Sequence, residues 1–232
     1  MIFNDVEKDY IRVRKELFRP PSPPIAFDSI EQRKGGSRVK SKRFTNIELP
    51  VPIRISSKKR IEELKEEMSD WLIKDEAKKL VFKDTPNRYY LAYYEGMELD
   101  EKTPYYATGY IYFYLPDGHR YGEQKTIQVT TTPTTHTITG QDETPWIVEV
   151  VFTSATDKFE LQTNKGLYLL LGYNFIEGDR LTIKYEGREV WLNGEDLRHA
   201  VRMKSNYEML EPGEIEISVS HECNLIYDER YY

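Results

Sequence analysis

Histidine and cysteine are the side chains of this sequence best suited to metal binding or nucleophilic catalysis. The four histidines, His119, His136, His199 and His221, are widely separated, and none stands in a His-x-His or His-x-x-x-His relation that could seed a metal site. Cys223 is the only cysteine, so neither an intramolecular disulfide nor a thiolate cluster can form, which favours intracellular folding. The sequence also lacks a nucleophile elbow, a phosphate-binding loop and a dinucleotide fingerprint. It therefore predicts no catalytic residue, no metal site and no cofactor.

Carboxylates are plentiful, but their positions do not indicate a catalytic pair. One group of four falls on the polar face of a predicted helix: Glu62, Glu63, Glu66 and Glu67. A glycosidase would need two acids that converge on a cleft, and nothing in the sequence indicates such a pair. We interpret these acids as a solvated face and do not expect an enzyme.

A basic cluster surrounds a glycine pair in the segment Ser29–Arg43. Its members are Arg33, Lys34, Gly35, Gly36, Arg38, Lys40, Lys42 and Arg43. This segment is either a solvated loop, a nucleic-acid arm or a loop that joins neighbouring subunits. No aromatic residue lies between Phe27 and Phe44 to stack on bases, and a net charge of −6 with a pI near 5.4 is unusual for a nucleic-acid binder. We therefore do not expect sequence-specific nucleic-acid binding.

Three aromatic residues in the second half could bind carbohydrate. Trp146, Tyr173 and Trp191 could stack on sugar rings, which would suit a module that attaches to cell-wall sugar. The alternative is that Trp146 and Trp191, which lie on predicted strands, belong to the core.

One amphipathic helix organises the first half of the chain. Its apolar residues fall at i, i+3, i+7, i+10 and i+11 and so share one face: Ile61, Leu64, Met68, Trp71 and Leu72. This spacing predicts a helix over about residues 57–73 with a buried face, and Ser56 or Ser57 could serve as its N-cap.

Strands are predicted around this helix at Phe44–Ile55, Leu80–Lys83, Tyr89–Tyr94, Tyr105–Leu115 and Gly122–Thr131. Leu17–Phe27, with its RPPSPP run, should be an extended connector, and Pro50 and Pro52 place their strand at a sheet edge or bulge.

The second half of the chain reads as an all-β domain. The threonine-rich segment Thr130–Gly140 is interpreted as an interdomain connector. Short strands separated by turn signals follow, as in a sandwich: Trp146–Thr153, Phe159–Thr163, Leu167–Leu171, Leu181–Tyr185, Glu189–Leu192 and Glu214–Ser220. The longest gap is Glu195–Gly213, where a helical turn or covering loop is expected. This is too short for a projecting arm.

No segment approaches the length of a membrane span, and no signal peptide is evident, so membrane association is not expected. The 18 tyrosines have two interpretations. They either suit half-buried strands or contribute to an assembly interface, where tyrosine is also enriched.

Two blocks of sequence resemble the distal tail proteins of long-tailed phages. The first block is IELPVPIRI, a helix that ends in SDWL, and KKLVFKDTPNRYYLAYYEG; the second is GDRLTIKYEGREVWLNGE followed by LEPGEIEISVS. The resemblance implies a mainly β protein with one helix and two sandwich-type domains, the second galectin-like or carbohydrate-binding-module-like. It also implies that Asn224–Tyr232 returns to the first domain, which would comprise residues 1–132 and 222–232, with residues 140–221 as the second.

The same resemblance implies a structural virion protein of the tail tip or baseplate hub. Such a protein would form a homo-oligomer, a hexameric ring, in contact with the tail tube protein, the tail-associated fibre or lysin protein and the tape measure protein. It would belong to the virion tail and be assembled in the host cytoplasm. In this family the counterpart of the basic segment is a glycine-containing loop and hairpin in ring packing, which implies a subunit contact.

Overall fold

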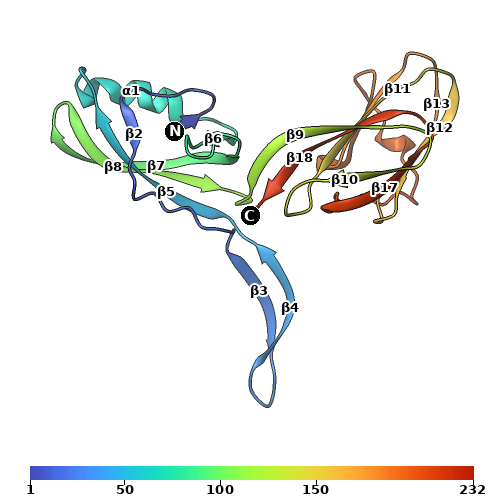
Figure 1. Ribbon diagram of the computed structural model, residues 1–232, viewed down its shortest axis with the longest axis horizontal. Helices are drawn as coiled ribbons and strands as arrows, with labels where there is room; N and C mark the ends of the chain where they lie inside the picture. Colours follow the sequence, from blue (N-terminus) through green and yellow to red (C-terminus); the bar gives the residue numbers. More distant parts are fainter. The chain divides into compact units, whose positions relative to one another are not determined.

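The computed structural model describes all 232 residues, and the chain divides into two compact units (Figure 1). Unit 1 contains residues 1–121 and Tyr232, and unit 2 contains residues 122–231. The expectation of a mainly β protein is confirmed, because the only α-helix is α1 (Ile61–Leu72). None of the helices is both long and apolar enough to cross a bilayer.

Unit 1 is an antiparallel sheet with α1 on one face and a separate two-stranded ribbon. Its strands are β1 (Ile2–Phe3), β2 (Ile11–Val13), β3 (Ile25–Glu31), β4 (Ser37–Phe44), β5 (Ile47–Ser56), β6 (Lys78–Val81), β7 (Tyr89–Thr103) and β8 (Tyr106–Leu115). The central order is β2-β5-β8-β7, and β6 joins the start of β7 to β1. Strands β3 and β4 pair only with each other.

The predicted apolar face of α1 is buried as expected. All five residues of the face are at most 5% exposed, and they share a core with the inward residues of β5 and β8. Trp71 sits at the end of this face, where its ring meets the Phe3 ring edge-on at 6.1 Å and its Nε1 donates to the Phe3 carbonyl at 2.9 Å. Tertiary packing therefore holds the helix.

The N-terminus of α1 differs from the serine-capped start that the sequence predicts. The N-cap is Arg60, which makes no side-chain cap bond, and the Ser57 hydroxyl accepts from the Lys59 amide instead. The Ile61 amide donates to the carbonyl of Pro104, in the β7–β8 turn, at 2.8 Å. A backbone acceptor distant in sequence thus satisfies the donor that a local side chain was expected to satisfy.

Strand β5 has one fully paired edge and one edge that proline restricts. It pairs with β8 from Ile47↔Leu115 to Ser56↔Tyr106, but with β2 only over Ile53–Ile55. The Pro52 carbonyl accepts from the Arg14 amide at 2.9 Å, so residue 52 faces the β2 side. Pro50 faces the same way by alternation, and neither residue can donate a ladder bond. The edge position expected from the two prolines is confirmed.

Unit 2 is a two-sheet sandwich around its own core. The first sheet has the order β16-β15-β14-β11-β18-β9 and the second β10-β17-β12-β13. The strands are β9 (Arg120–Val129), β10 (Thr134–Ile138), β11 (Trp146–Val151), β12 (Thr156–Thr163), β13 (Tyr168–Phe175), β14 (Arg180–Lys184), β15 (Glu189–Leu192), β16 (Glu195–Asp196), β17 (Gly213–Val219) and β18 (Cys223–Tyr231). Inward residues of both sheets meet in the core, where the Phe152 and Phe175 rings stack at 4.2 Å.

Two segments of unit 2 differ from the sequence-based expectation. Residues 134–138 of the expected connector form β10, which pairs with β17 from Thr134↔Ile217 to Ile138↔Gly213. Strand β18 pairs with β11, and its alternate residues Cys223, Leu225 and Tyr227 are buried in the unit 2 core. The final strand therefore lies in unit 2, and only Tyr232 groups with unit 1.

The long connection before β17, Glu195–Gly213 of the sequence analysis, packs against the sandwich. It contains the short helix η2 (Arg198–Ala200), while a second short helix, η1 (Glu186–Arg188), precedes β15. Three isolated β-bridges pair this connection with the rest of unit 2: Leu171↔Val201, Tyr168↔Asn206 and Thr144↔Leu210. The expectation of a covering loop in place of an arm is confirmed.

Candidate functional site

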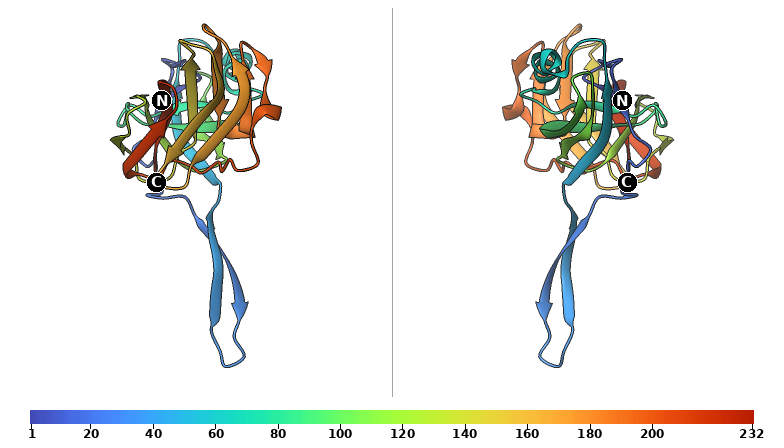
Figure 2. Two further views of the ribbon diagram at one scale, coloured as in Figure 1. Left: turned by 90° about the vertical axis from the view of Figure 1, so that its right-hand side faces the viewer. Right: turned by 90° about the vertical axis from the view of Figure 1, so that its left-hand side faces the viewer.

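The β3–β4 hairpin is a ribbon without a core, and it carries the basic cluster (Figures 1 and 2). The expected loop is therefore a hairpin with the register Ile25↔Phe44 to Glu31↔Ser37, which shifts by one residue between Asp28 and Ser29. At its tip, Gly35 and Gly36 adopt φ values of 97° and 81°, which glycine tolerates best. The Gln32 amide donates to the Gly36 carbonyl at 2.9 Å and closes the turn.

All the basic side chains of the hairpin point into solvent. Residues 25–44 include six basic residues and two acidic ones, Asp28 and Glu31, for a net charge of +4. Since the whole chain carries −6, the remainder carries −10. The six basic residues are exposed and form no ion pair within the subunit. An isolated subunit thus presents unneutralised positive charge.

The hairpin also exposes apolar side chains that the sequence analysis did not single out. Phe27 is 61% exposed, Val39 52% and Ile25 42%. Ile25 and Phe27 alternate along β3, and Val39 lies opposite Ser29, so all three share one face of the ribbon. The alternating apolar residues of IAFDSIE were a signal for this face, but the surrounding charge obscured it. Two-stranded ribbons are marginally stable alone, so this face is suited to covering by another surface.

The base of the hairpin is held more firmly than its tip. The Thr45 amide donates to the Pro24 carbonyl at 2.9 Å, and the Phe44 ring lies against His119 and Tyr232 at 5.7 and 5.2 Å. A side chain at Gly118 would meet Pro23 at 2.9 Å, which shows how closely the preceding turn approaches the base. The hairpin is thus anchored at one end only.

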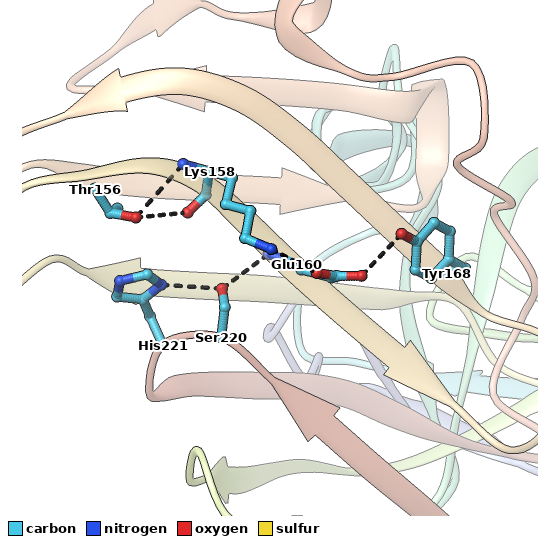
Figure 3. Close-up of polar contacts among 6 residues, drawn as sticks. All are labelled: Thr156, Lys158, Glu160, Tyr168, Ser220 and His221. Carbon is cyan, nitrogen blue, oxygen red and sulfur yellow. Dashed lines mark hydrogen bonds and ion pairs between the residues drawn. The ribbon is translucent and has the colours of Figure 1, made fainter.

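A serine, a histidine and a glutamate gather on the second sheet of unit 2, but not in a catalytic arrangement (Figure 3). Ser220 Oγ lies 3.0 Å from His221 Nδ1 and also accepts from the Glu160 amide at 2.9 Å. The Glu160 carboxylate accepts from Tyr168 and Lys158, contacts that lower its pKa, and it does not orient the imidazole. Burial beside the Phe152 ring lowers the pKa of His221. This network joins β12, β13 and the end of β17.

The three candidate sugar-binding aromatics do not form one surface. Trp146 is 1% exposed, its Nε1 donates to the Glu208 carbonyl at 2.8 Å, and its ring stacks on Tyr207, so it cannot contact a sugar. Tyr173 and Trp191 are 38% and 37% exposed, but they lie on β13 and β15, in opposite sheets of the sandwich. The core interpretation is therefore correct for Trp146. The core interpretation does not hold for Trp191, and sugar stacking by Tyr173 or Trp191 stays a prediction.

The histidines are not brought together by the fold. His119 lies before β9, His136 on β10, His199 in η2 and His221 after β17. Across the chain, no three His, Cys, Asp or Glu side chains converge as metal ligands.

The outward face of β8 carries four of the tyrosines. Tyr106, Tyr110, Tyr112 and Tyr114 alternate with buried residues, and the Tyr110 and Tyr112 rings stack at 6.2 Å. The Tyr112 hydroxyl donates to Glu98 at 3.0 Å, and this bond raises the pKa of Tyr112. These residues are half-buried to exposed, as expected for strands, and the face remains available to a partner.

Two family models match the chain. The model described as the siphovirus-type tail component, C-terminal domain, matches residues 139–231, and that of the phage tail protein RIFT-related domain matches residues 8–115. A curated relative, the distal tail protein of Bacillus phage SPP1, is 33% identical over 138 residues. That alignment covers 57% of this chain and 54% of the relative, so the chain spans about half the length of the curated relative it matches.

Solved structures share the fold. The crystal structure of SPP1 Dit, described as a paradigm of the hub adsorption apparatus in phages that infect Gram-positive hosts, matches with a TM-score of 0.88 at 20% identity. That match covers 100% of this chain and 98% of the other. A chain of the phage P2 baseplate in its activated conformation matches with a TM-score of 0.56 at 7% identity and covers 95% of this chain and 90% of the other. The similarity therefore extends over both units.

Proposed function

This chain belongs to the siphophage distal tail protein family, and from that premise we propose that it is a structural virion protein, the distal tail hub of a long-tailed phage. The observation that carries the proposal is the match of the whole chain to SPP1 Dit, together with the sequence relationship to the SPP1 distal tail protein. The role is non-enzymatic, and the protein belongs to the tail of the virion, assembled in the host cytoplasm.

In the proposed hub, six copies form a ring. Unit 1 builds the ring, with the tail tube protein on one side and the tail-associated fibre or lysin protein on the other, and the tape measure protein is a further partner. Because each copy uses one patch to meet a different patch on the next, the interface is heterologous and closes by rotation. The basic hairpin supports this assignment, since its exposed apolar face and unpaired charges lack a partner within the subunit.

Native mass spectrometry of the full chain tests the hexamer. Six copies of a 27.5 kDa chain give a particle of about 165 kDa, which should be the main species at high protein concentration. A protein that remains a 27.5 kDa monomer at every accessible concentration would contradict the proposal. The fraction of hexamer should also fall as salt is added, because an interface with a charged component weakens as ionic strength rises.

A further inference from the structure

The outward face of the first sheet of unit 2 carries the one exposed tryptophan of the chain. Trp71 and Trp146 are 5% and 1% exposed, whereas Trp191 on β15 is 37% exposed. Burial of an indole ring removes a large apolar area from water, and Trp191 gives up part of that gain. It thereby offers a flat apolar surface to a ligand.

Trp191 belongs to a line of side chains that crosses five strands. The register pairs Trp191 with Asp196 on β16 and with Thr182 on β14. It continues from Thr182 to Glu149 on β11 and then to Asn224 on β18. Side chains at directly opposed positions share a face, and all five are exposed or partly exposed. Paired strands lie about 4.8 Å apart, so this line, the Trp191 row, is about 19 Å long.

Three members of the Trp191 row have unused hydrogen-bonding groups. Thr182 offers a hydroxyl, Glu149 a carboxylate and Asn224 an amide, which together supply donors and acceptors. None of the three makes a side-chain hydrogen bond or ion pair within the chain. The row therefore presents polar groups that a ligand can bind without breaking contacts inside the subunit.

The indole and the acid opposite it are held by their neighbours. Trp191 Nε1 donates to the Glu189 carboxylate at 3.1 Å, and Lys184 pairs with the same carboxylate at 3.0 Å. Arg198 Nε donates to both oxygens of Asp196, at 3.0 and 2.8 Å, and the bonds from Arg198 lower the pKa of Asp196 to about 2. Because these contacts position the side chains in advance, less conformational freedom is lost on binding.

A small hollow adjoins the row on the same face. Its volume is about 120 Å³, and its apolar lining comes from Ile147 and Ile226, which pair two residues along from Glu149 and Asn224. Pockets for whole small molecules hold roughly 300 Å³ or more, so the hollow is too small for one. It has room for one substituent of a ligand that lies along the row.

The charges of this surface favour a neutral ligand. Two ion pairs offset each other's charge, Lys184 with Glu189 and Arg198 with Asp196. Glu149 has no basic partner, so the row has one uncompensated negative charge, which disfavours an anionic ligand. A stacking ring beside hydroxyl, amide and carboxylate groups matches a molecule with apolar ring faces and many hydroxyls.

We propose that the Trp191 row binds an uncharged oligosaccharide, with one sugar ring stacked on Trp191 and the following rings hydrogen-bonded to the polar members of the row. Sugar hydroxyls donate and accept, as do the groups that face them. Trp146 and Tyr173 take no part, because one is buried and the other lies on the opposite sheet. The inference goes beyond the hub function and does not depend on ring formation.

A glycan array tests the ligand class with the full chain. The probes are linear neutral oligosaccharides of glucose, galactose, mannose, rhamnose and N-acetylglucosamine, with uronic-acid oligosaccharides as anionic counterparts. We expect retention on at least one neutral glycan of four rings. Retention on none of the neutral glycans, or on the anionic ones alone, would overturn the proposal.

Acrylamide quenching locates the bound glycan. Since Trp191 is exposed and the other tryptophans are buried, acrylamide quenches Trp191 preferentially, and a retained glycan should protect it. Trp191→Ala should weaken binding about tenfold or more, and Trp191→Phe should keep part of the affinity. The matched control is Tyr173→Ala, at a residue that is 38% exposed, and it should leave binding unchanged. Undiminished binding by Trp191→Ala would exclude the site.

Ligand length tests the rest of the row. Asn224 lies three strands from Trp191, about 14 Å away, so Asn224→Ala should weaken binding of the tetrasaccharide and not of the disaccharide. An unchanged unfolding midpoint confirms that the variant is folded. Equal effects on both lengths, or none on either, would contradict a ligand laid along the row.

These outcomes are separate from those of the hub proposal. A chain that assembles into hexamers but binds no neutral glycan refutes the carbohydrate site and leaves the hub proposal intact. A chain that stays monomeric yet binds a neutral glycan through Trp191 does the reverse.

Discussion

Helix α1 and the β3–β4 hairpin both combine a charged surface with an apolar face, yet only the helix has its apolar face covered. Five residues of α1 are buried against β5 and β8, whereas Ile25, Phe27 and Val39 of the hairpin face solvent. The apolar residues of α1 pack against the subunit core, whereas those of the hairpin have no partner within the subunit. The difference indicates that α1 contributes to folding of the subunit, and it supports the proposal that the hairpin contributes to assembly.

The largest expected effect comes from removing the main aromatic anchor of α1. Trp71→Ala should lower the free energy of unfolding by ~3–5 kcal/mol, because it leaves a cavity and removes one of the two donors to the Phe3 carbonyl, the other being the Val6 amide. Chemical denaturation followed by circular dichroism measures this loss. The matched variant in the hairpin, Phe27→Ala, should change subunit stability by no more than about 0.5 kcal/mol. Equal effects of the two substitutions would remove the distinction between the segments.

Replacing the tip of the hairpin should affect association and not folding. A short glycine-serine linker in place of Arg33–Arg43 removes the six basic residues and one exposed apolar residue, none of which supports the unit 1 core. We expect an unchanged unfolding midpoint and a loss of self-association of about tenfold or more. Light scattering over a concentration series measures the loss. Unaltered oligomerisation would contradict the subunit-contact role and leave the interpretation of a solvated segment.

The smallest expected effect concerns the exposed face of α1 and its pH dependence. Lys8 donates to Glu67 at 2.7 Å, and this contact, with a weaker one from Tyr10, lowers the pKa of Glu67. A depressed carboxyl pKa contributes stability above the unfolded value of about 4.3, and that contribution is lost as the pH falls through the folded value. Since the Glu67 side chain is 41% exposed, Glu67→Gln should cost only ~0.2–1 kcal/mol at neutral pH.

Denaturation at several pH values checks this sign. The stability difference between the native chain and Glu67→Gln should be present at neutral pH and shrink under acidic conditions. A difference that grows on acidification would show that the pair does not stabilise the charged carboxylate.

Prediction from sequence succeeded where a repeating pattern was strong and local. The spacing of Ile61 to Leu72 predicted α1, and alternating strands with turn signals predicted the sandwich. The threonine-rich β10 was missed because its polar side chains resemble a connector, although backbone pairing with β17 holds it. The last strand was expected to return to the first domain, but β18 lies between β11 and β9 and groups with unit 2, because the choice of sheet depends on contacts distant in sequence.

The candidate site was only partly predictable for the same reason. Composition located the basic residues of the hairpin, but not the apolar face that Phe27 and Val39 form, because the cross-strand register decides which side chains share a face. The buried position of Trp146 likewise depends on Tyr207 and Glu208, about sixty residues away. The residue type of Trp146 suggested a sugar contact, but its burial excludes one.

Pro50 and Pro52 have a consequence for which edge of the central sheet can pair with another chain. They block most of one long edge of the central sheet, so the unpaired stretch of β7 is the long edge left to recruit a strand. Two β7 edges that met would bring Glu95, Glu98, Asp100 and Glu101 of both copies together, and like charges oppose that encounter. Indiscriminate sheet-to-sheet polymerisation is thereby disfavoured. Like charge on the β7 edges therefore favours association with an oppositely charged strand over association between two β7 edges.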